Sequence, residues 1–153
     1  EQARNVFPDL ALVLFGSHHS PGIPDYAEFH LAPPVKKIRE IYTSCDVFLS
    51  PSWSEGCQLP PMEAMACGCA VVATNVGGIP DYAINGETVI AVSPKRPDLL
   101  SEALLGILRD DEKRQRVARA GQHVGDWHWP CGRGGILWSC QLSCVSDEGL
   151  SGQ

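Results

Sequence analysis

The sequence predicts an α/β fold, with a parallel sheet and helices on both of its faces. Apolar runs of strand length occur within residues 10–15, 46–50, 70–74 and 88–92, and continuous runs of this kind are expected for strands covered on both sides. Segments with helical spacing separate these runs, and strands that alternate with helices favour a parallel sheet. The 153 residues are the length of one domain.

The first part of the chain is predicted to supply two strands and two helical segments. A helix end is followed by an apolar strand, a loop rich in Pro and Gly, a short strand closed by Pro33 and Pro34, and a helix. Ile38, Ile41 and Tyr42 form one apolar stripe on that helix. The predicted elements are residues 1–6, 10–15, 27–31 and 35–44.

The middle of the chain is predicted to form a strand, a loop, a helix and a second strand. Pro51 stops the strand at 46–50, and Pro60 and Pro61 suit the first turn of a helix, where a missing N–H costs little. Gly68 ends this helix, and the strand at 70–74 follows. Two carboxylates flank the helix start, Glu55 in the loop and Glu63, which we expect inside the first helical turn.

The remainder is predicted to add a short helix, a strand and two longer helices before the character of the sequence changes. We expect these elements at 80–84, 88–92, 97–109 and 111–120, with Gly121 as the natural stop of the last helix. From about residue 126 the chain is rich in Trp, Cys and Gly without a helical period. We therefore treat residues 123–153 as an atypical tail, irregular or non-native in sequence.

The overall composition excludes several classes of function. A net charge of -6 gives no nucleic-acid footprint, and no apolar run is long enough to span a membrane. His18 and His19 are adjacent in a loop without a third ligand nearby, so we expect no metal site there. Cys45, Cys67 and Cys69 lie among apolar residues, which favours small core residues in a reduced, cytoplasmic protein over a metal or disulfide role.

The stretch from Glu55 to Gly68, EGCQLPPMEAMACG, carries the strongest signal, and residues 71–74 (VVAT) and the pair Gly77-Gly78 follow it. This pattern resembles the donor-binding half of glycosyltransferase family 4, over about residues 7–122. The resemblance implies the C-terminal half of a GT-B fold, in which two Rossmann-like domains face each other. It also implies that residues 1–122 are a donor domain truncated at the N-terminus, with the first strand missing, the acceptor domain absent and the true beginning of the chain upstream.

The same resemblance implies a role for each matching residue. Glu63 matches the family's ribose-binding Glu, while Glu55 matches the Glu that holds the donor sugar and is our candidate catalytic residue. Backbone amides near the helix start and the glycine pair would hold the diphosphate and sugar. The full set of predicted donor-binding positions is Glu55, Gly56, Cys57, Gln58, Leu59, Glu63, Gly77 and Gly78.

The function implied is retaining, metal-independent glycosyl transfer in polysaccharide biosynthesis, with a nucleotide-diphosphate sugar as substrate and no cofactor. Nucleic acid is not an expected partner, and any peripheral membrane contact would be made through the absent domain. Cys57-Gln58 departs from the family's Phe-Gly, and Asp81 stands where the family has Glu. The family's phosphate-gripping Arg and Lys lie outside the chain.

Two alternative functions remain open from the sequence. The chain could be a non-catalytic Rossmann-like module that binds a nucleotide or a protein, or part of a sugar-nucleotide epimerase, which shares the two-domain architecture. Each candidate residue taken singly also has a simpler interpretation. Glu63 could be only a first-turn acid favoured by the helix dipole, and Glu55 could be a solvated loop residue. The glycine pair could simply form a turn.

Overall fold

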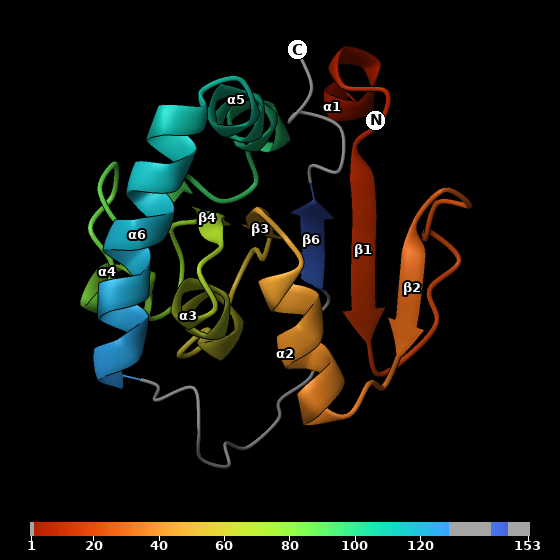
Figure 1. Cartoon of the computed structure of the whole chain (residues 1–153), viewed down its shortest axis with the longest axis horizontal. Coiled ribbons are helices and arrows are strands. Elements are labelled where there is room, and N and C mark those ends of the chain that lie inside the picture. The colour runs from red at the N-terminus through yellow and green to blue at the C-terminus, as the bar shows by residue number, and fades with distance from the viewer. Residues whose placement is uncertain (1, 129–141, 147–153) are drawn as a thin grey trace.

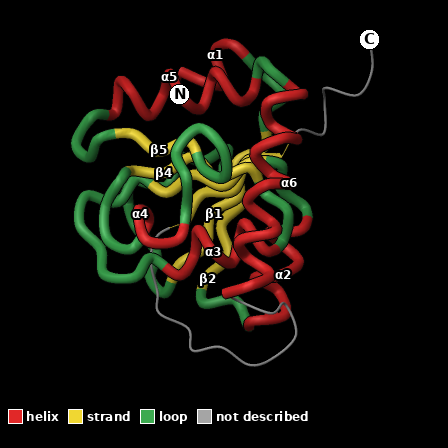
Figure 2. The backbone as a smooth tube through the Cα atoms, turned by 90° about the vertical axis from the view of Figure 1, so that its left-hand side faces the viewer, coloured by secondary structure: helices red, strands yellow, loops and turns green. Residues whose placement is uncertain are grey.

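The computed structural model describes residues 2–128 and 142–146 of the chain, and in this part a sheet of six strands lies between two layers of helices (Figures 1 and 2). The strands are β1 (Ala11–Gly16), β2 (Glu28–Leu31), β3 (Val47–Ser50), β4 (Ala70–Thr74), β5 (Ile90–Val92) and β6 (Leu142–Ser146). The helices are α1 (Gln2–Val6), α2 (Val35–Thr43), α3 (Leu59–Ala66), α4 (Ile79–Tyr82), α5 (Pro97–Leu108) and α6 (Asp111–His128).

Five of these strands point in the same direction, which confirms the predicted parallel sheet. The strand order is β2-β1-β6-β3-β4-β5. The pairs β1–β2, β3–β4 and β4–β5 are parallel. β6 is antiparallel to both β1 and β3, so β1 and β3 are parallel to each other.

β6 occupies the centre of the sheet. In a doubly wound sheet the first strand lies at the centre, and the strands that follow it extend first to one side and then to the other. Here β1 and β2 lie on one side of β6, and β3, β4 and β5 lie on the other. The position at which the sequence predicts a missing first strand is therefore filled by residues 142–146, in the opposite direction.

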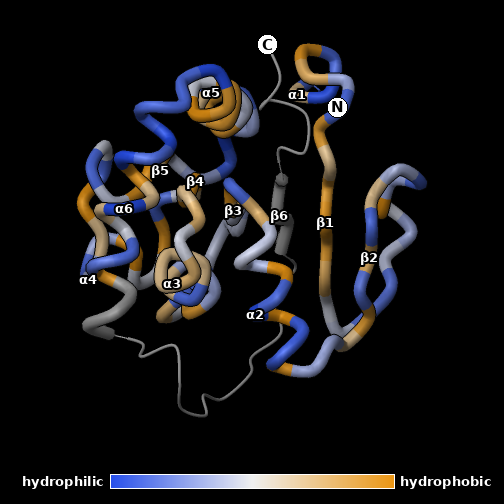
Figure 3. Tube along the Cα trace, viewed as in Figure 1, coloured by the Kyte–Doolittle hydropathy of each residue, from blue (hydrophilic) through white to orange (hydrophobic). Residues whose placement is uncertain are grey.

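Alternate residues of β1, β3, β4 and β5 face opposite helix layers. Val13, Phe48 and Val71 contact the cluster beneath α2 and α3, whereas Val47 and Val72 contact the cluster beneath α1 and α5. Burial on both faces explains why these strands are nearly continuous apolar runs. Figure 3 shows the apolar character of β1, which is hydrophobic along most of its length.

The last helix is longer than predicted. Gly121 was expected to end it, but α6 continues to His128. A Cβ at Gly121 would lie 3.0 Å from the carbonyl oxygen of Thr88 and 3.3 Å from Cγ of Met65. The glycine therefore allows α6 to approach α3 closely, and this tertiary contact outweighs its weak helix propensity.

The predicted tail, residues 123–153, lies partly outside the described residues. Within the described part, residues up to His128 continue α6 and Leu142–Ser146 form β6, so these segments are regular. The prediction for 129–141 and 147–153 concerns residues outside the described ones. In residues 2–128 and 142–146, no helix combines the length and the apolar character needed to cross a bilayer.

Candidate functional site

The loop after β3, residues 51–58, starts at the carboxyl edge of the sheet. Thr74, at the end of β4, directs its hydroxyl at the carbonyl oxygen of Ser50, 3.4 Å away, and at that of Ser52. Thr74 is buried. A side chain of the neighbouring strand thus fixes the first residues of the loop, close to the central strands where ligands bind in open α/β sheets.

Glu55 lies in this loop and is half-buried. The Ser52 hydroxyl donates a hydrogen bond to Oε1 of Glu55 over 2.8 Å. This contact turns one carboxylate oxygen toward the start of the loop, so Glu55 is held in place rather than freely solvated. The interpretation of Glu55 as a solvated loop residue is therefore weakened.

The glycine pair after β4 packs directly against the same loop. The amide of Gly78 donates to the carbonyl oxygen of Gly56 over 2.8 Å. Gly77 has φ +57, and a Cβ there would lie 2.2 Å from that oxygen; at Gly78 it would lie 2.8 Å from the carbonyl oxygen of Cys57. Real Cβ atoms do not approach so closely, so both positions require glycine.

The start of α3 offers few backbone donors. The helix begins at Leu59, and the next two residues are Pro60 and Pro61, which have no N–H. Of the four N–H positions that a helix start leaves without an intrahelical partner, those of Gln58 and Leu59 remain. Both residues follow the loop that leaves the carboxyl end of β3, and they lie at the positive end of the helix dipole.

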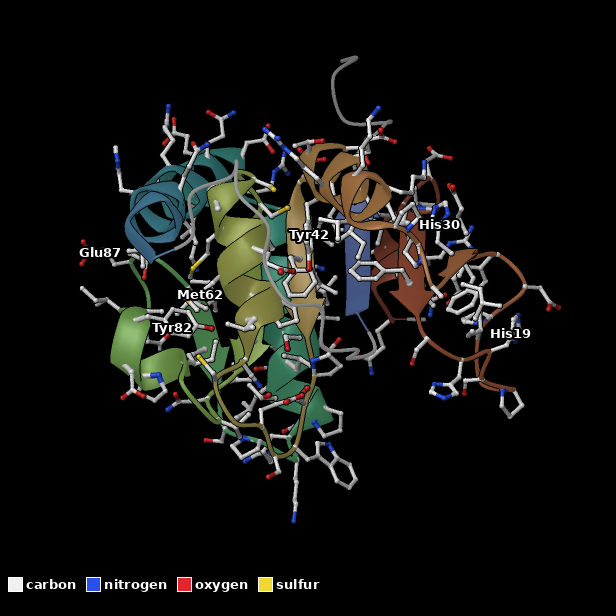
Figure 4. All side chains as sticks on the ribbon, turned by 90° about the horizontal axis from the view of Figure 1, so that it is seen from below. His19, His30, Tyr42, Met62, Tyr82 and Glu87 are labelled. Atoms are coloured by element: carbon white, nitrogen blue, oxygen red, sulfur yellow. The ribbon has the colours of Figure 1, made fainter. Side chains whose placement is uncertain are left out.

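Gln58 is unusual in backbone and side chain. It has φ +49, a left-handed conformation that suits the family's glycine better than glutamine. Its side chain is 5% exposed, and both amide atoms lack a hydrogen-bond partner among the described residues. Its carbonyl oxygen accepts a hydrogen bond over 3.1 Å from the hydroxyl of Tyr82, on α4 (Figure 4). Burial raises the pKa of Tyr82, and the nearby Cys57 adds to this shift.

Glu63 lies in the second turn of α3, not in the first as predicted, since the helix begins at Leu59, before both prolines. It lies about 6 Å along the helix axis from Leu59, at 1.5 Å per residue. The first-turn acid interpretation therefore loses its basis, because the dipole effect falls off within the first turn. Instead, the hydroxyl of Tyr42 on α2 donates to Oε2 of Glu63 over 3.2 Å.

The surroundings of Glu63 act on its charge in two opposing ways. Burial raises the pKa of this half-buried carboxyl group, and the hydrogen bond from Tyr42 lowers it by a smaller amount. The group is thus partly withdrawn from water and has one fixed donor. This is an arrangement for holding a carboxylate in one orientation.

The predicted residues thus fall into two neighbouring groups. The loop residues Glu55–Gln58 contact the pair Gly77-Gly78 at the carboxyl ends of β3 and β4. Glu63 follows one helical turn further along α3, where it contacts α2. Among the described residues, no three His, Cys, Asp or Glu side chains are grouped as a metal site would need.

Sequence reasoning missed four residues that support the site: Tyr42, Ser52, Thr74 and Tyr82. Tyr42 was assigned only to the apolar stripe of its helix, although a buried tyrosine hydroxyl requires a partner and therefore signals a polar contact. Ser52 lies three residues before Glu55, a local spacing that could have indicated their bond. The contacts of Thr74 and Tyr82 link residues 22 and 24 positions apart, and no local pattern predicts them.

A family model described as glycosyl transferases group 1 matches residues 4–124. The chain belongs to this family. Its glycosyltransferase relatives include the D-inositol 3-phosphate glycosyltransferases of Corynebacterium diphtheriae, 35% identical over 71% of the chain, and of Corynebacterium efficiens, 36% identical over 78%. The alpha-maltose-1-phosphate synthase of Mycolicibacterium smegmatis is 35% identical over 63% of the chain.

Solved glycosyltransferase structures share the fold. The C-terminal domain of the group 1 family protein LpcC from Francisella tularensis aligns with a TM-score of 0.63 and 27% identity, covering 72% of this chain and 57% of that one. Sucrose-phosphate synthase from Thermosynechococcus elongatus aligns with a TM-score of 0.63 and 29% identity, covering 67% and 26%. These likenesses confirm the predicted C-terminal Rossmann-like domain of a GT-B fold.

The chain spans about a quarter of the length of the curated relatives it matches, 26% and 27% for the two Corynebacterium proteins.

Proposed function

We propose that this chain carries the nucleotide-sugar donor site of a glycosyltransferase that retains the anomeric configuration and needs no metal ion. The contact between residues 55–58 and Gly77-Gly78, at the carboxyl edge of the sheet, is the observation that supports it most. Two loops meet there beside the start of a helix. This is the kind of place where open α/β sheets bind nucleotides.

The diphosphate of the donor would lie against the start of α3. The N–H groups of Gln58 and Leu59 would donate to its oxygens, and the helix dipole would favour its negative charge. Charge increases on the departing diphosphate during transfer, so donors already in place stabilise the transition state. Because Pro60 and Pro61 reduce the number of donors, the diphosphate would need further positive charge beyond the helix start.

The ribose and the sugar would be held by the two carboxylates. Glu63 would accept hydrogen bonds from the two ribose hydroxyls, as a carboxylate with several lone pairs can. Glu55, held by Ser52, would accept from a hydroxyl of the transferred sugar and so fix the position of the anomeric carbon. The amides of Gly56 and Cys57 would contact the same sugar.

The acceptor site would be formed by the part of the protein outside this chain. Holding donor and acceptor in one geometry can contribute roughly 7–11 kcal/mol to catalysis, so we expect the isolated chain to transfer no sugar. A structural neighbour, HepE from Anabaena, is described in complex with UDP-glucose, which makes UDP the first nucleotide to test. Glycan assembly in the cytoplasm, with a polysaccharide as product, remains part of the proposal.

Calorimetric titration of the 153-residue chain with UDP, ADP and GDP tests the proposal. Loss of a charge-assisted bidentate contact by Glu63→Gln should weaken binding by about 1.5–3 kcal/mol, which is about 13- to 160-fold in affinity. Glu87→Gln is the matched control, because Glu87 is exposed and Figure 4 shows it at the edge of the molecule. Equal affinity of Glu63→Gln and the unaltered chain would refute the ribose assignment. Nucleotide binding without glycoside formation by the longer protein would favour a non-catalytic module.

A further inference from the structure

Tyr42 is held rigidly in the layer between α2 and the sheet. It is 1% exposed, and its ring meets two aromatic rings edge to face. The centroid of Phe15, on β1, is 5.8 Å away, and that of Phe48, on β3, is 5.6 Å away. The thiol of Cys69 donates to the backbone carbonyl oxygen of Tyr42 over 3.1 Å. Ring and backbone are thus both fixed, and the hydroxyl has a defined position.

That position is at the carboxylate of Glu63. The hydroxyl donates to Oε2 over 3.2 Å and links α2 to α3 across 21 positions of sequence. Figure 4 shows Tyr42 beside α3. A phenylalanine would fill the same aromatic layer, so the hydroxyl contributes nothing to packing that the ring does not already supply. Its effect on Glu63 is polar, because it binds and orients the carboxylate.

We propose that Tyr42 is a positioning residue of the donor site, which binds Oε2 of Glu63 and leaves the carboxylate oriented to accept the hydroxyls of a ribose. The inference rests on the proposed function, because it assumes that Glu63 binds ribose. A glutamate side chain has several rotatable bonds, and ordering them on binding costs affinity. A buried tyrosine that restricts the carboxylate beforehand removes part of that cost.

The test is a comparison of ribose and dideoxyribose ligands. Amide-shift NMR titrations of the 153-residue chain give dissociation constants for the tightest-binding of UDP, ADP and GDP and for its 2′,3′-dideoxy analogue. The dissociation constant of the dideoxy analogue divided by that of the ribose nucleotide measures how strongly the ribose hydroxyls are recognised. Tyr42→Phe should lower this ratio about fivefold, since hydrogen bonds to charged groups are among the stronger ones, while affinity for the dideoxy analogue stays the same. Glu63→Gln should lower the ratio at least as much.

Two comparisons separate a positioning role from a structural one. If Tyr42 only supports the fold, Tyr42→Phe will weaken both ligands equally and leave the ratio unchanged, which would overturn the inference. The control is Tyr26→Phe, because Tyr26 is 42% exposed and contacts Arg4 instead; it should change neither constant. An unchanged ratio in Glu63→Gln, or no binding of any of the three nucleotides, would overturn the proposed function and this inference with it. A lowered ratio in Glu63→Gln alone would overturn only the role of Tyr42.

Discussion

Replacing Gly77 by alanine should detach the loop of residues 55–58 from the loop after β4. Gly77 has φ +57, where an L side chain costs about 1–2 kcal/mol. The new Cβ would lie 2.2 Å from the carbonyl oxygen of Gly56 and 3.0 Å from that of Glu55. Both contacts are with backbone, so a side-chain rotation cannot relieve them and one loop must move.

The cost can be estimated from these contacts. Overpacking of this kind costs about 1–3 kcal/mol, and moving the loop also breaks the bond from Gly78 to Gly56, worth about 0.5–1.5 kcal/mol. Gly86→Ala is the matched control, because Gly86 has φ +83 but a Cβ there would have no atom within 4 Å. It carries the backbone strain without the clash. We therefore expect Gly77→Ala to be about 2–4 kcal/mol less stable than Gly86→Ala.

Urea unfolding followed by circular dichroism measures this difference, and nucleotide titration of the folded variants measures the effect on the site. Gly77→Ala should also bind nucleotide more weakly, whereas Gly86→Ala should bind as the unaltered chain does. Equal stability of the two variants would refute the packing of one loop against the other, and with it the main support for the site.

Three further predictions use the same unfolding assay. Gly121→Ala should lower the free energy of unfolding by about 1 kcal/mol, because the clash with the carbonyl oxygen of Thr88 and with Met65 exceeds the gain in helix propensity. Gly106→Ala, where nothing lies within 4 Å, should raise it by about 0.5–1 kcal/mol. The opposite order would contradict the close packing of α6 at Gly121. Burial raises the pKa of Glu63 above its ordinary value of 4.5, so the folded state binds more protons and stability falls as pH rises above that value. Glu63→Gln should therefore gain stability relative to the unaltered chain as the pH rises above about 4.5. A stability difference that does not change with pH would be evidence against the raised pKa. Gln58→Gly should stabilise the fold by about 1 kcal/mol, because relief of the left-handed strain and of an unpaired buried amide outweighs the lost apolar contacts; a loss of stability would show that the side chain has a partner.

Burial on both faces made most of the sheet predictable. The strands β1, β3 and β4 are apolar because helices cover them on both sides, and such runs are visible in the sequence. The elements β2, α2, α4, β5 and α5 were also placed within a few residues of their observed bounds. Turn residues and prolines mark these bounds locally.

The errors arise where distant contacts decide the structure. Gly121 has the sequence character of a helix end, but its contact with α3 keeps α6 helical. Glu63 was expected in the first turn of α3, but the helix begins at Leu59, four residues before it, which places Glu63 in the second turn. Leu142–Ser146 pair with β1 and β3, at the central position where the first strand of a doubly wound sheet lies. No local sequence pattern predicts this pairing.

In the candidate site, too, features with a local sequence signal were predicted and features that depend on distant contacts were not. The carboxylates and the glycine pair were found from their types and spacing, whereas the residues that hold them were not. The hydroxyl of Tyr42 donates to Glu63 from another helix, and that of Tyr82 donates to the carbonyl oxygen of Gln58 from α4, which follows the next strand. Contacts of this kind depend on the packed fold, so a single sequence gives little sign of them.

Mapping where a nucleotide binds is the most direct test of the central claim. Amide shifts of the labelled 153-residue chain, recorded as UDP, ADP or GDP is added, locate the ligand without assuming a mechanism. We predict that the largest shifts occur at residues 55–59, at Gly77 and Gly78, and at Glu63. Shifts confined to other surfaces, such as the surroundings of Arg4 and Tyr26 near the amino ends of β1 and β2, would contradict the donor site at the carboxyl edge of the sheet.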